Sequence, residues 1–180
     1  MDEAWISVDV ETSGPTPGTG SMIAIGACLV HQPDIQFVNM IAPIPGLPWS
    51  DEAEAVHGLP REYLAREGLP PEIAMRSFVD WVDTAAAGRR PVFVGFNATF
   101  DWMFVADYAL RFVGRNPFGI SGLDLKALYM GRHLDDVRRW AETSSDHIAR
   151  RYSLSLPHTH APLDDALEQA EICRRILAGG

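Results

Sequence analysis

Three short segments of the sequence carry acidic side chains within apolar surroundings: residues 5–12, 94–104 and 160–166. In the first segment Asp9 and Glu11 are two residues apart. On a β-strand their carboxylates therefore point from the same face, about 6.6 Å apart along the strand. Two carboxylates over one spot form a potential site for a divalent cation, and the alternative is a solvated strand edge.

Basic residues are missing from these acidic segments. The chain has 15 Lys and Arg residues, yet none of them falls within the three segments. If the segments converge, repulsion raises the proton affinity of the carboxylates and destabilises the fold unless cations neutralise the cluster. Oxygen ligands suit Mg²⁺ or Mn²⁺, and two such ions could serve phosphoryl transfer by activating water and stabilising the leaving oxygen.

The third acidic segment opens a helix at Pro162, a residue type that is common at the first helical position. The apolar stripe of this helix comprises Leu163, Ala166, Leu167, Ala170, Cys173 and Leu177. Asp164 falls in line with Glu168 on the polar face. Asp165 instead falls in line with Gln169, on the flank of the buried face. Helix phase therefore selects Asp165 as the ligand candidate.

Two further side chains complete the constellation. Asp101 is expected in the first turn of a helix that directly follows a strand, at the kind of strand end where α/β proteins bind ligands. His160 lies five residues before Asp165. The pKa of histidine, about 6.5 when unperturbed, suits a general base at neutral pH. His158 competes with His160 on residue type alone.

Hydrophobic patterning supplies the elements that must position these residues. Three β-prone runs open the chain and predict a meander: 5–10, 22–30 and 37–41. A turn rich in Gly, Pro and Thr over 13–20 separates the first two runs, and a proline-rich loop over 42–50 follows the third.

Helical periodicity dominates the rest of the chain. It predicts a short helix over 51–56, a longer one over 71–87 and a third from Phe100 to Phe112. Strands are predicted over 91–95 and 123–125, with Asp124 capping the helix that follows, and two or more helices close the chain. Antiparallel strands followed by β-α alternation predict an α/β protein with a mixed five-stranded sheet flanked by helices.

Length and composition predict one globular domain over residues 1–180, with 47% hydrophobic and 22% charged residues. The longest apolar run, 22–30, is far shorter than the roughly 20 residues that span a bilayer, so no membrane span is expected. Cys28 and Cys173 are expected as buried thiols, which favours a cytoplasmic protein. A net charge of −9 argues against a protein that coats long nucleic acid, because such binding depends on cationic side chains. It does not argue against an enzyme that binds a few nucleotides through metal ions.

The three acidic motifs, in this order, resemble those of a known family. They are Asp9-Val-Glu11, Asn97-Ala-Thr-Phe-Asp101 and His160-Ala-Pro-Leu-Asp-Asp165. They resemble the DEDDh branch of the DnaQ-like exonucleases, which includes ribonuclease T, oligoribonuclease and the proofreading subunit of the bacterial replicative polymerase. The resemblance covers nearly the whole chain. It implies a ribonuclease-H-like fold and metal-dependent 3′-5′ hydrolysis of single-stranded RNA or DNA to nucleoside 5′-monophosphates.

The resemblance also implies a role for each motif residue. Asp9 bridges two ions, while Glu11 and Asp165 complete the tighter ion site. Asp101 supports the second ion, and His160 is the general base. All five positions are filled in this chain.

The sequence also suggests residues that contact the substrate. The candidates are Thr12, Gly14, Asn97 and Phe100. Helical spacing favours a core position for Phe100 and Phe104, with base stacking as the alternative, and leaves Trp102 open. The chain departs from the family at Phe96, where a histidine often precedes the motif asparagine, and at Ala24, where the second strand often carries an acid. These departures bear on substrate preference.

Two interpretations remain open for a group of arginines in the C-terminal third: Arg132, Arg138, Arg139, Arg150 and Arg151. They guide a phosphate backbone, or they form a solvated face paired to nearby acids. Two other functions also fit the sequence. One is a catalytically silent module that binds nucleic acid or a polymerase, and the other is a phosphodiesterase of small nucleotides. The oligomeric state is open, with a homodimer as one option.

Overall fold

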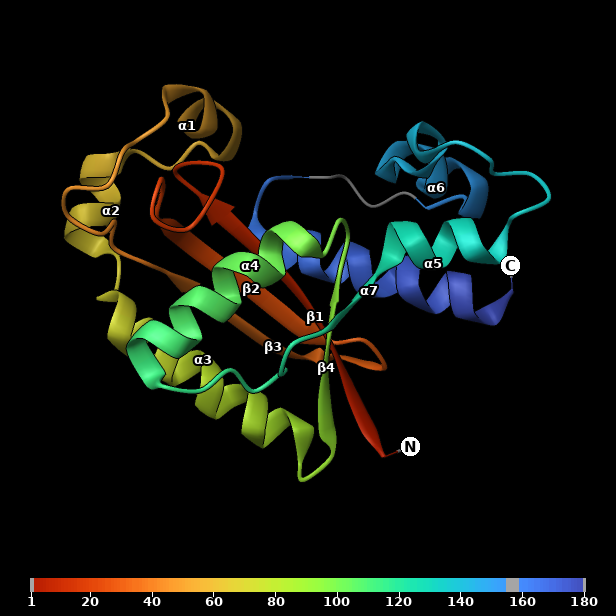
Figure 1. The fold of residues 1–180 in the computed structure, drawn as a ribbon, viewed down its shortest axis with the longest axis horizontal. Coiled ribbons are helices and arrows are strands. Elements are labelled where there is room, and N and C mark those ends of the chain that lie inside the picture. Colours follow the sequence, from red (N-terminus) through yellow and green to blue (C-terminus); the bar gives the residue numbers. More distant parts are fainter. Residues whose placement is uncertain (1, 155–158, 180) are drawn as a thin grey trace.

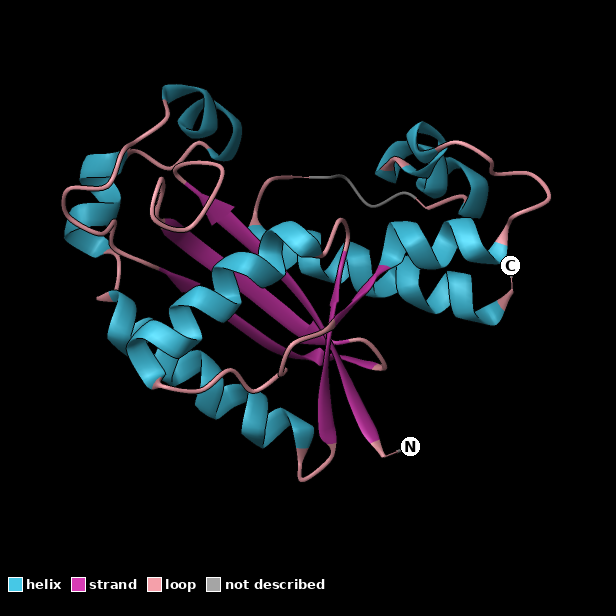
Figure 2. Ribbon diagram, viewed as in Figure 1, coloured by secondary structure: helices cyan, strands magenta, loops and turns pink. Residues whose placement is uncertain are grey.

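The computed structural model describes residues 2–154 and 159–179. At its centre is a five-stranded sheet with the strand order β3-β2-β1-β4-β5 (Figures 1 and 2). The strands are β1 (Glu3–Thr12), β2 (Met22–Leu29), β3 (Gln32–Met40), β4 (Arg90–Gly95) and β5 (Gly122–Asp124). β1 pairs antiparallel with β2 and parallel with β4, so it lies where the two halves of the sheet meet. The mixed sheet confirms the prediction from the sequence.

Helices cover both faces of the sheet. They are α1 (Asp51–His57), α2 (Arg61–Glu67), α3 (Pro71–Ala86), α4 (Thr99–Tyr108), the π-helix η1 (Ala109–Val113), α5 (Leu125–Arg132), the 3-10 helix η2 (Trp140–Thr143), α6 (Ser145–Tyr152) and α7 (Pro162–Ala178). α3 and α4 pack on one face, and α5 and α7 pack on the other (Figure 1). In the ranges that the structure describes, no helix has the length and apolar character needed to cross a membrane.

Side chains of β1 alternate between two hydrophobic cores. The even-numbered positions are buried in the core shared with α3 and α4: Ile6, Val8 and Val10. Trp5 points the other way and packs against the second core, which includes residues of α5 and α7. Because side chains alternate along a strand, Asp9 and Glu11 share the face of Trp5 and look toward α7. The apolar partners of β1 therefore fix the direction of its two acids.

Two elements differ from expectation for reasons of burial. β3 begins at Gln32, five residues before the predicted start. The prediction missed these first residues because β3 is an edge strand, and its exposed residues show no apolar alternation. α2 was not predicted at all. It has seven residues and buries only Leu64, so the sequence carries no helical period there.

Two further differences concern where helices begin and end. The helix expected through Phe112 ends as α4 at Tyr108 and continues as η1, and at this junction the Tyr108 hydroxyl accepts a hydrogen bond from Met22 N–H (2.8 Å). Leu125 was expected in the last strand but begins α5, because Asp124 ends β5 and caps that helix.

Candidate active site

One pocket, with a volume of about 340 Å³, gathers most of the residues that the sequence marked. They are Asp9, Glu11, Asn97, Phe100, Asp101, His160 and Asp165. The pocket lies near the carboxyl ends of β1 and β4, beside the starts of α4, α6 and α7. Such strand ends are where α/β proteins usually bind ligands. Three segments far apart in the sequence therefore converge.

Gly26 of β2 lets the start of α7 come close to the sheet. It pairs with Asp9 across the β1-β2 ladder. A Cβ atom at this position would lie 2.2 Å from the carbonyl carbon of Pro162, so only glycine fits beneath the helix start. This close approach brings Asp165, in the first turn of α7, to the acids of β1. Asp165 is buried, with 2% of its surface exposed.

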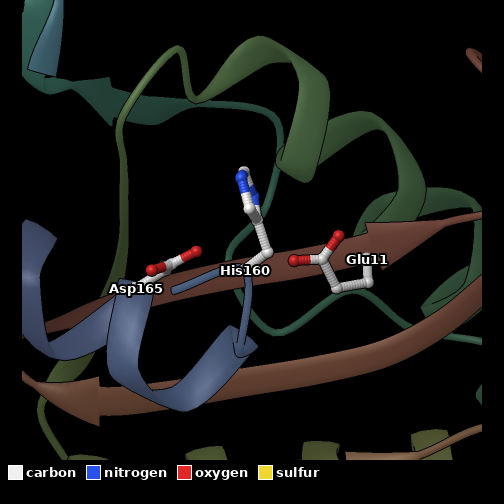
Figure 3. A group of neighbouring side chains, drawn as sticks. All are labelled: Glu11, His160 and Asp165. Atoms are coloured by element: carbon white, nitrogen blue, oxygen red, sulfur yellow. The ribbon is translucent and has the colours of Figure 1, made fainter. Parts of the chain in front are cut away.

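Glu11, His160 and Asp165 form a compact group. One ligand atom from each side chain lies within 4.8 Å of the other two. Figure 3 shows that the three side chains come from β1, from the segment that precedes α7 and from α7 itself. Asp165 Oδ1 also accepts a hydrogen bond from the backbone N–H of Thr159 (3.1 Å), which ties the His160 segment to the helix.

His160 has an unusual backbone conformation. Its φ of 54° lies in the left-handed region, which residues other than glycine adopt at an energetic cost. Strain of this kind concentrates at functional sites, where the surrounding structure holds it. His160 is a member of the group with Glu11 and Asp165, and the competing His158 lies outside the described residues.

Asp101 and Asp124 position the start of α4. Asp101 is 5% exposed, and its Oδ1 accepts a hydrogen bond from Val10 N–H (3.0 Å), between the two acids of β1. Asp124 Oδ2 accepts from Ala98 N–H (2.7 Å), just before α4. Its Oδ1 accepts from Ala127 N–H (2.9 Å), which confirms the predicted cap of α5. One carboxylate thus joins the starts of two helices.

Gln169 holds Asp9 in place, a role that no sequence motif marks. Its Nε2 donates to Asp9 Oδ1 (2.7 Å), and its Oε1 accepts from Phe96 N–H (3.0 Å). The side chain is 5% exposed, and both ends of its amide are bonded. Gln169 lies one helical turn after Asp165, so the helix phase that selected Asp165 also placed Gln169 on the correct flank.

Burial and mutual repulsion raise the proton affinity of the acids. Burial raises the pKa of Asp9 well above its usual range, and the charges of the three neighbouring acids add to this effect, whereas the bond from Gln169 opposes it. Burial, followed by the charges of Asp165 and Asp101, raises the pKa of Glu11 to about 8. Burial likewise raises the pKa of Asp101 to about 7, against the effect of backbone hydrogen bonds.

The donor set of the pocket fits a divalent cation. Among the described lining residues there is no Lys or Arg to balance the carboxylates. Carboxylate oxygens are the ligands that Mg²⁺ and Mn²⁺ prefer. A cation at this site would supply the positive charge that the raised pKa values of Asp9 and Glu11 show to be missing.

The expected substrate contacts divide into two pairs. Asn97 and Phe100 line the pocket. The Phe100 ring also lies 5.3 Å from that of Phe104, so it contributes to the core as well. Thr12 and Gly14 are not among the described lining residues. Thr12 ends β1, and its hydroxyl donates to the Gly14 carbonyl in the turn that follows (2.9 Å).

The lining also includes Phe96, which the sequence linked to substrate preference, and residues that were not expected there, such as Ser145 and Glu168. Glu168 was predicted to share the polar face of Asp164, but it is buried, with 5% of its surface exposed. This side of α7 faces the pocket, whereas Asp164 is exposed as predicted. Ser145 begins α6, and its position depends on how distant segments pack.

Two of the C-terminal arginines fit the solvated-face interpretation. The ion pairs are Arg139–Glu142 (2.7 Å) and Arg151–Asp136 (3.0 Å). Two of the five arginines are thus paired to nearby acids, as that interpretation expects, whereas no ion pair is seen for Arg132, Arg138 or Arg150 among the described residues.

Comparison with known proteins gives one curated relative at substantial identity. No family model matches the sequence. The chain is similar to the 3′-5′ DNA exonuclease Cap18 of Escherichia coli, with 42% identity over 176 residues. The alignment spans 97% of this chain and 91% of the relative.

Solved structures share the fold at lower identity. The nuclease domain of 3′hExo, a DEDDh family member bound to rAMP, matches with a TM-score of 0.78 and 15% identity over 98% of this chain and 92% of its own. Cell-death related nuclease 4 matches with a TM-score of 0.76 and 18% identity, and the match covers 100% of this chain and 66% of that nuclease. The complex of E. coli exonuclease I with single-stranded DNA matches with a TM-score of 0.74 and 13% identity, and the match covers 99% of this chain and 41% of exonuclease I. These matches confirm the ribonuclease-H-like fold. With the identity to Cap18, they establish that the chain belongs to the DEDDh branch of the DnaQ-like 3′-5′ exonucleases.

Proposed function

We propose that this chain hydrolyses single-stranded DNA from a free 3′ end and releases nucleoside 5′-monophosphates. The observation that carries the proposal is the convergence of four acids and one histidine on a single pocket without a basic side chain among its described lining residues. DNA is the proposed substrate because the relative at 42% identity is named a DNA exonuclease.

We propose two ions at this site, Mg²⁺ or Mn²⁺. Asp9, Glu11 and Asp165 would hold one ion, and Asp9 with Asp101 would hold the other. When bound, the ions supply positive charge that stabilises the negative charge developing on the phosphate during in-line displacement.

Side chains of the protein supply the remaining steps. His160 accepts the proton of the attacking water on an imidazole nitrogen, while the water oxygen bonds to the terminal phosphorus and the bond to the 3′ oxygen of the preceding nucleotide breaks. Gln169 keeps Asp9 oriented through the hydrogen bond that joins them. Asn97 and Phe100, which line the pocket, contact the terminal nucleotide.

The test is a time course on a single-stranded DNA oligomer labelled at its 5′ end, in Mg²⁺ or Mn²⁺. We expect stepwise shortening from the 3′ end. Asp165→Asn abolishes it, whereas Asp164→Asn, which changes the exposed neighbour, leaves it intact. Circular dichroism checks that both variants fold. Full activity of Asp165→Asn and of Asp9→Ala would contradict the proposal.

Further substrates separate the alternatives. A matched RNA oligomer that is cut faster than DNA would reverse the proposed substrate class. A dinucleotide that is cut far faster than longer strands would indicate a small-nucleotide phosphodiesterase. Failure to cut any single strand at several metal concentrations would indicate a catalytically silent module.

A further inference from the structure

A stack of three side chains leads out of the pocket across α5 and η2. Phe96 lines the pocket. The Nζ atom of Lys126, in α5, lies 5.8 Å from the centroid of the Phe96 ring and 4.6 Å from that of the Trp140 ring, in η2. The ammonium group therefore links an aromatic ring of the pocket to one outside it.

The outer members of this stack are an exposed ring and a cation that has no carboxylate partner in the part of the chain that the structure describes. Trp140 leaves 51% of its surface exposed, whereas the other four tryptophans are partly buried. Lys126 is the only lysine of the chain. Within residues 2–154 and 159–179 it forms no ion pair with a carboxylate. In a protein of net charge −9, an unpaired cation next to an exposed ring stands out.

Two observations place this pair beside the pocket. Phe96 connects Lys126 to the lining from the β4 side. Ser145, which also lines the pocket, begins α6 two residues after η2 ends at Thr143. The segment that carries Trp140 therefore borders the rim of the pocket.

We propose that Lys126 and Trp140 form a subsite for the part of a single DNA strand that precedes its 3′-terminal nucleotide. Trp140 stacks on a base, and Lys126 contacts a phosphate. The inference rests on the proposed function, which places the terminal nucleotide in the pocket. An aromatic face accepts any base, and a cation attracts any phosphate, so this subsite binds single strands without sequence preference.

Binding exchanges one contact for two. In the free protein the ammonium group lies over the Trp140 ring. An exposed cation–π contact is weaker than stacking of a base on an aromatic ring, so an arriving strand displaces it. The flexible lysine side chain then turns to the phosphate, and the ring face becomes available to the base.

The first experiment compares two substrates in Mg²⁺. One is a single-stranded DNA 10-mer, and the other is thymidine 5′-p-nitrophenyl phosphate, which carries one nucleotide and no preceding strand. We expect Trp140→Ala to raise KM for the 10-mer by about 5- to 100-fold relative to its effect on the ester. Trp140→Phe restores most of the affinity because it keeps an aromatic face. Leu134→Ala, an exposed apolar position nearby, is the matched control.

The second experiment measures binding without cleavage, by fluorescence anisotropy of a labelled 10-mer with the Asp165→Asn protein. Each cation that neutralises a phosphate of a single strand contributes about 0.7 to the slope of log Kd against log salt concentration. We expect Lys126→Gln to lower this slope by about 0.7 and Lys126→Arg to preserve it. Because the chain has one lysine, ¹³C-methylation gives a single side-chain NMR signal, which should shift when the 10-mer binds.

The outcomes separate the subsite from the function on which it rests. An unchanged KM in Trp140→Ala together with an unchanged salt slope in Lys126→Gln overturns the subsite. Equal losses on the 10-mer and the ester also overturn it, because they place the effect in the fold or the pocket. A wild-type protein that cleaves neither substrate contradicts the proposed function, and the anisotropy measurement then tests the subsite alone.

Discussion

Replacing Glu11 with glutamine should stabilise the metal-free protein at alkaline pH. Burial and two neighbouring acids raise the pKa of Glu11 from an ordinary 4.5 to about 8. A raised pKa means that the folded state holds the proton more tightly than the unfolded state. The resulting stabilisation is complete below about pH 4.5 and is lost as the pH rises through about 8.

The size of the effect follows from that change in pKa. It corresponds to roughly 5 kcal/mol in the free energy of unfolding if the group were fully shielded. Glu11 is only partly buried, and solvent screening reduces the figure to about 2–3 kcal/mol. For a chain of this length, such a difference shifts Tm by about 5–10 °C.

The assay is thermal unfolding followed by circular dichroism in the presence of a chelator. At about pH 8, Glu11→Gln should melt about 5–10 °C above the wild type, and at about pH 5 most of this difference should vanish. Adding Mg²⁺ should raise the Tm of the wild type more than that of the variant, because the variant lacks a ligand charge. Asp34→Asn, at an exposed carboxylate of β3, should change neither curve.

Two results would refute this reasoning. One is an equal Tm of wild type and Glu11→Gln at about pH 8 without metal. The other is a wild-type stability that does not fall between about pH 5 and about pH 8. Either result would mean that the pocket relieves its charge without a cation.

Three substitutions test how the site is positioned. Gly26→Ala places a Cβ atom against Pro162, so it should cost about 1–3 kcal/mol of stability in urea unfolding and displace α7 enough to lower nuclease activity at least tenfold. Gly131→Ala, in an open part of α5, is its control and should be neutral or stabilising by up to about 1 kcal/mol; equal effects of the two would argue against steric positioning. Gln169→Leu removes two partly buried hydrogen bonds, so calorimetry should detect weaker Mg²⁺ binding, and urea unfolding should show a loss of about 1–3 kcal/mol in stability. Unchanged metal affinity would count against the role of Gln169 in holding Asp9. Asp124→Ala should cost about 1 kcal/mol through the lost α5 cap and also lower activity, whereas a loss of stability alone would limit it to capping.

Much of the site could be predicted because two periodic patterns place its residues. Strand alternation puts Asp9 and Glu11 on one face, and the structure keeps them there because the even-numbered neighbours fill a core. Helix phase separates Asp165, which is buried, from Asp164, which is exposed. These inferences need only the local geometry of one strand and one helix.

The rest depends on tertiary contacts that no local pattern encodes. Glu168 has the spacing of a surface residue, but this side of α7 faces the pocket. Trp140 and Lys126 are 14 residues apart in sequence and meet only because the segment after α5 folds back over it. The edge position of β3 removed the alternation that would have revealed its first residues from Gln32 onward.

The hydrogen bonds from Ala98 N–H and Ala127 N–H to Asp124 fix the distance between the starts of α4 and α5. The first bond holds the helix that carries Asp101, and the second holds the helix that carries Lys126. The distance between the backbone that carries Asp101 and the backbone that carries Lys126 is therefore set by two backbone amides on one carboxylate, whatever position the flexible side chain of Lys126 takes. In our proposal, the shortest DNA strand that reaches both the pocket and the Lys126–Trp140 subsite should therefore stay the same after each removed nucleotide.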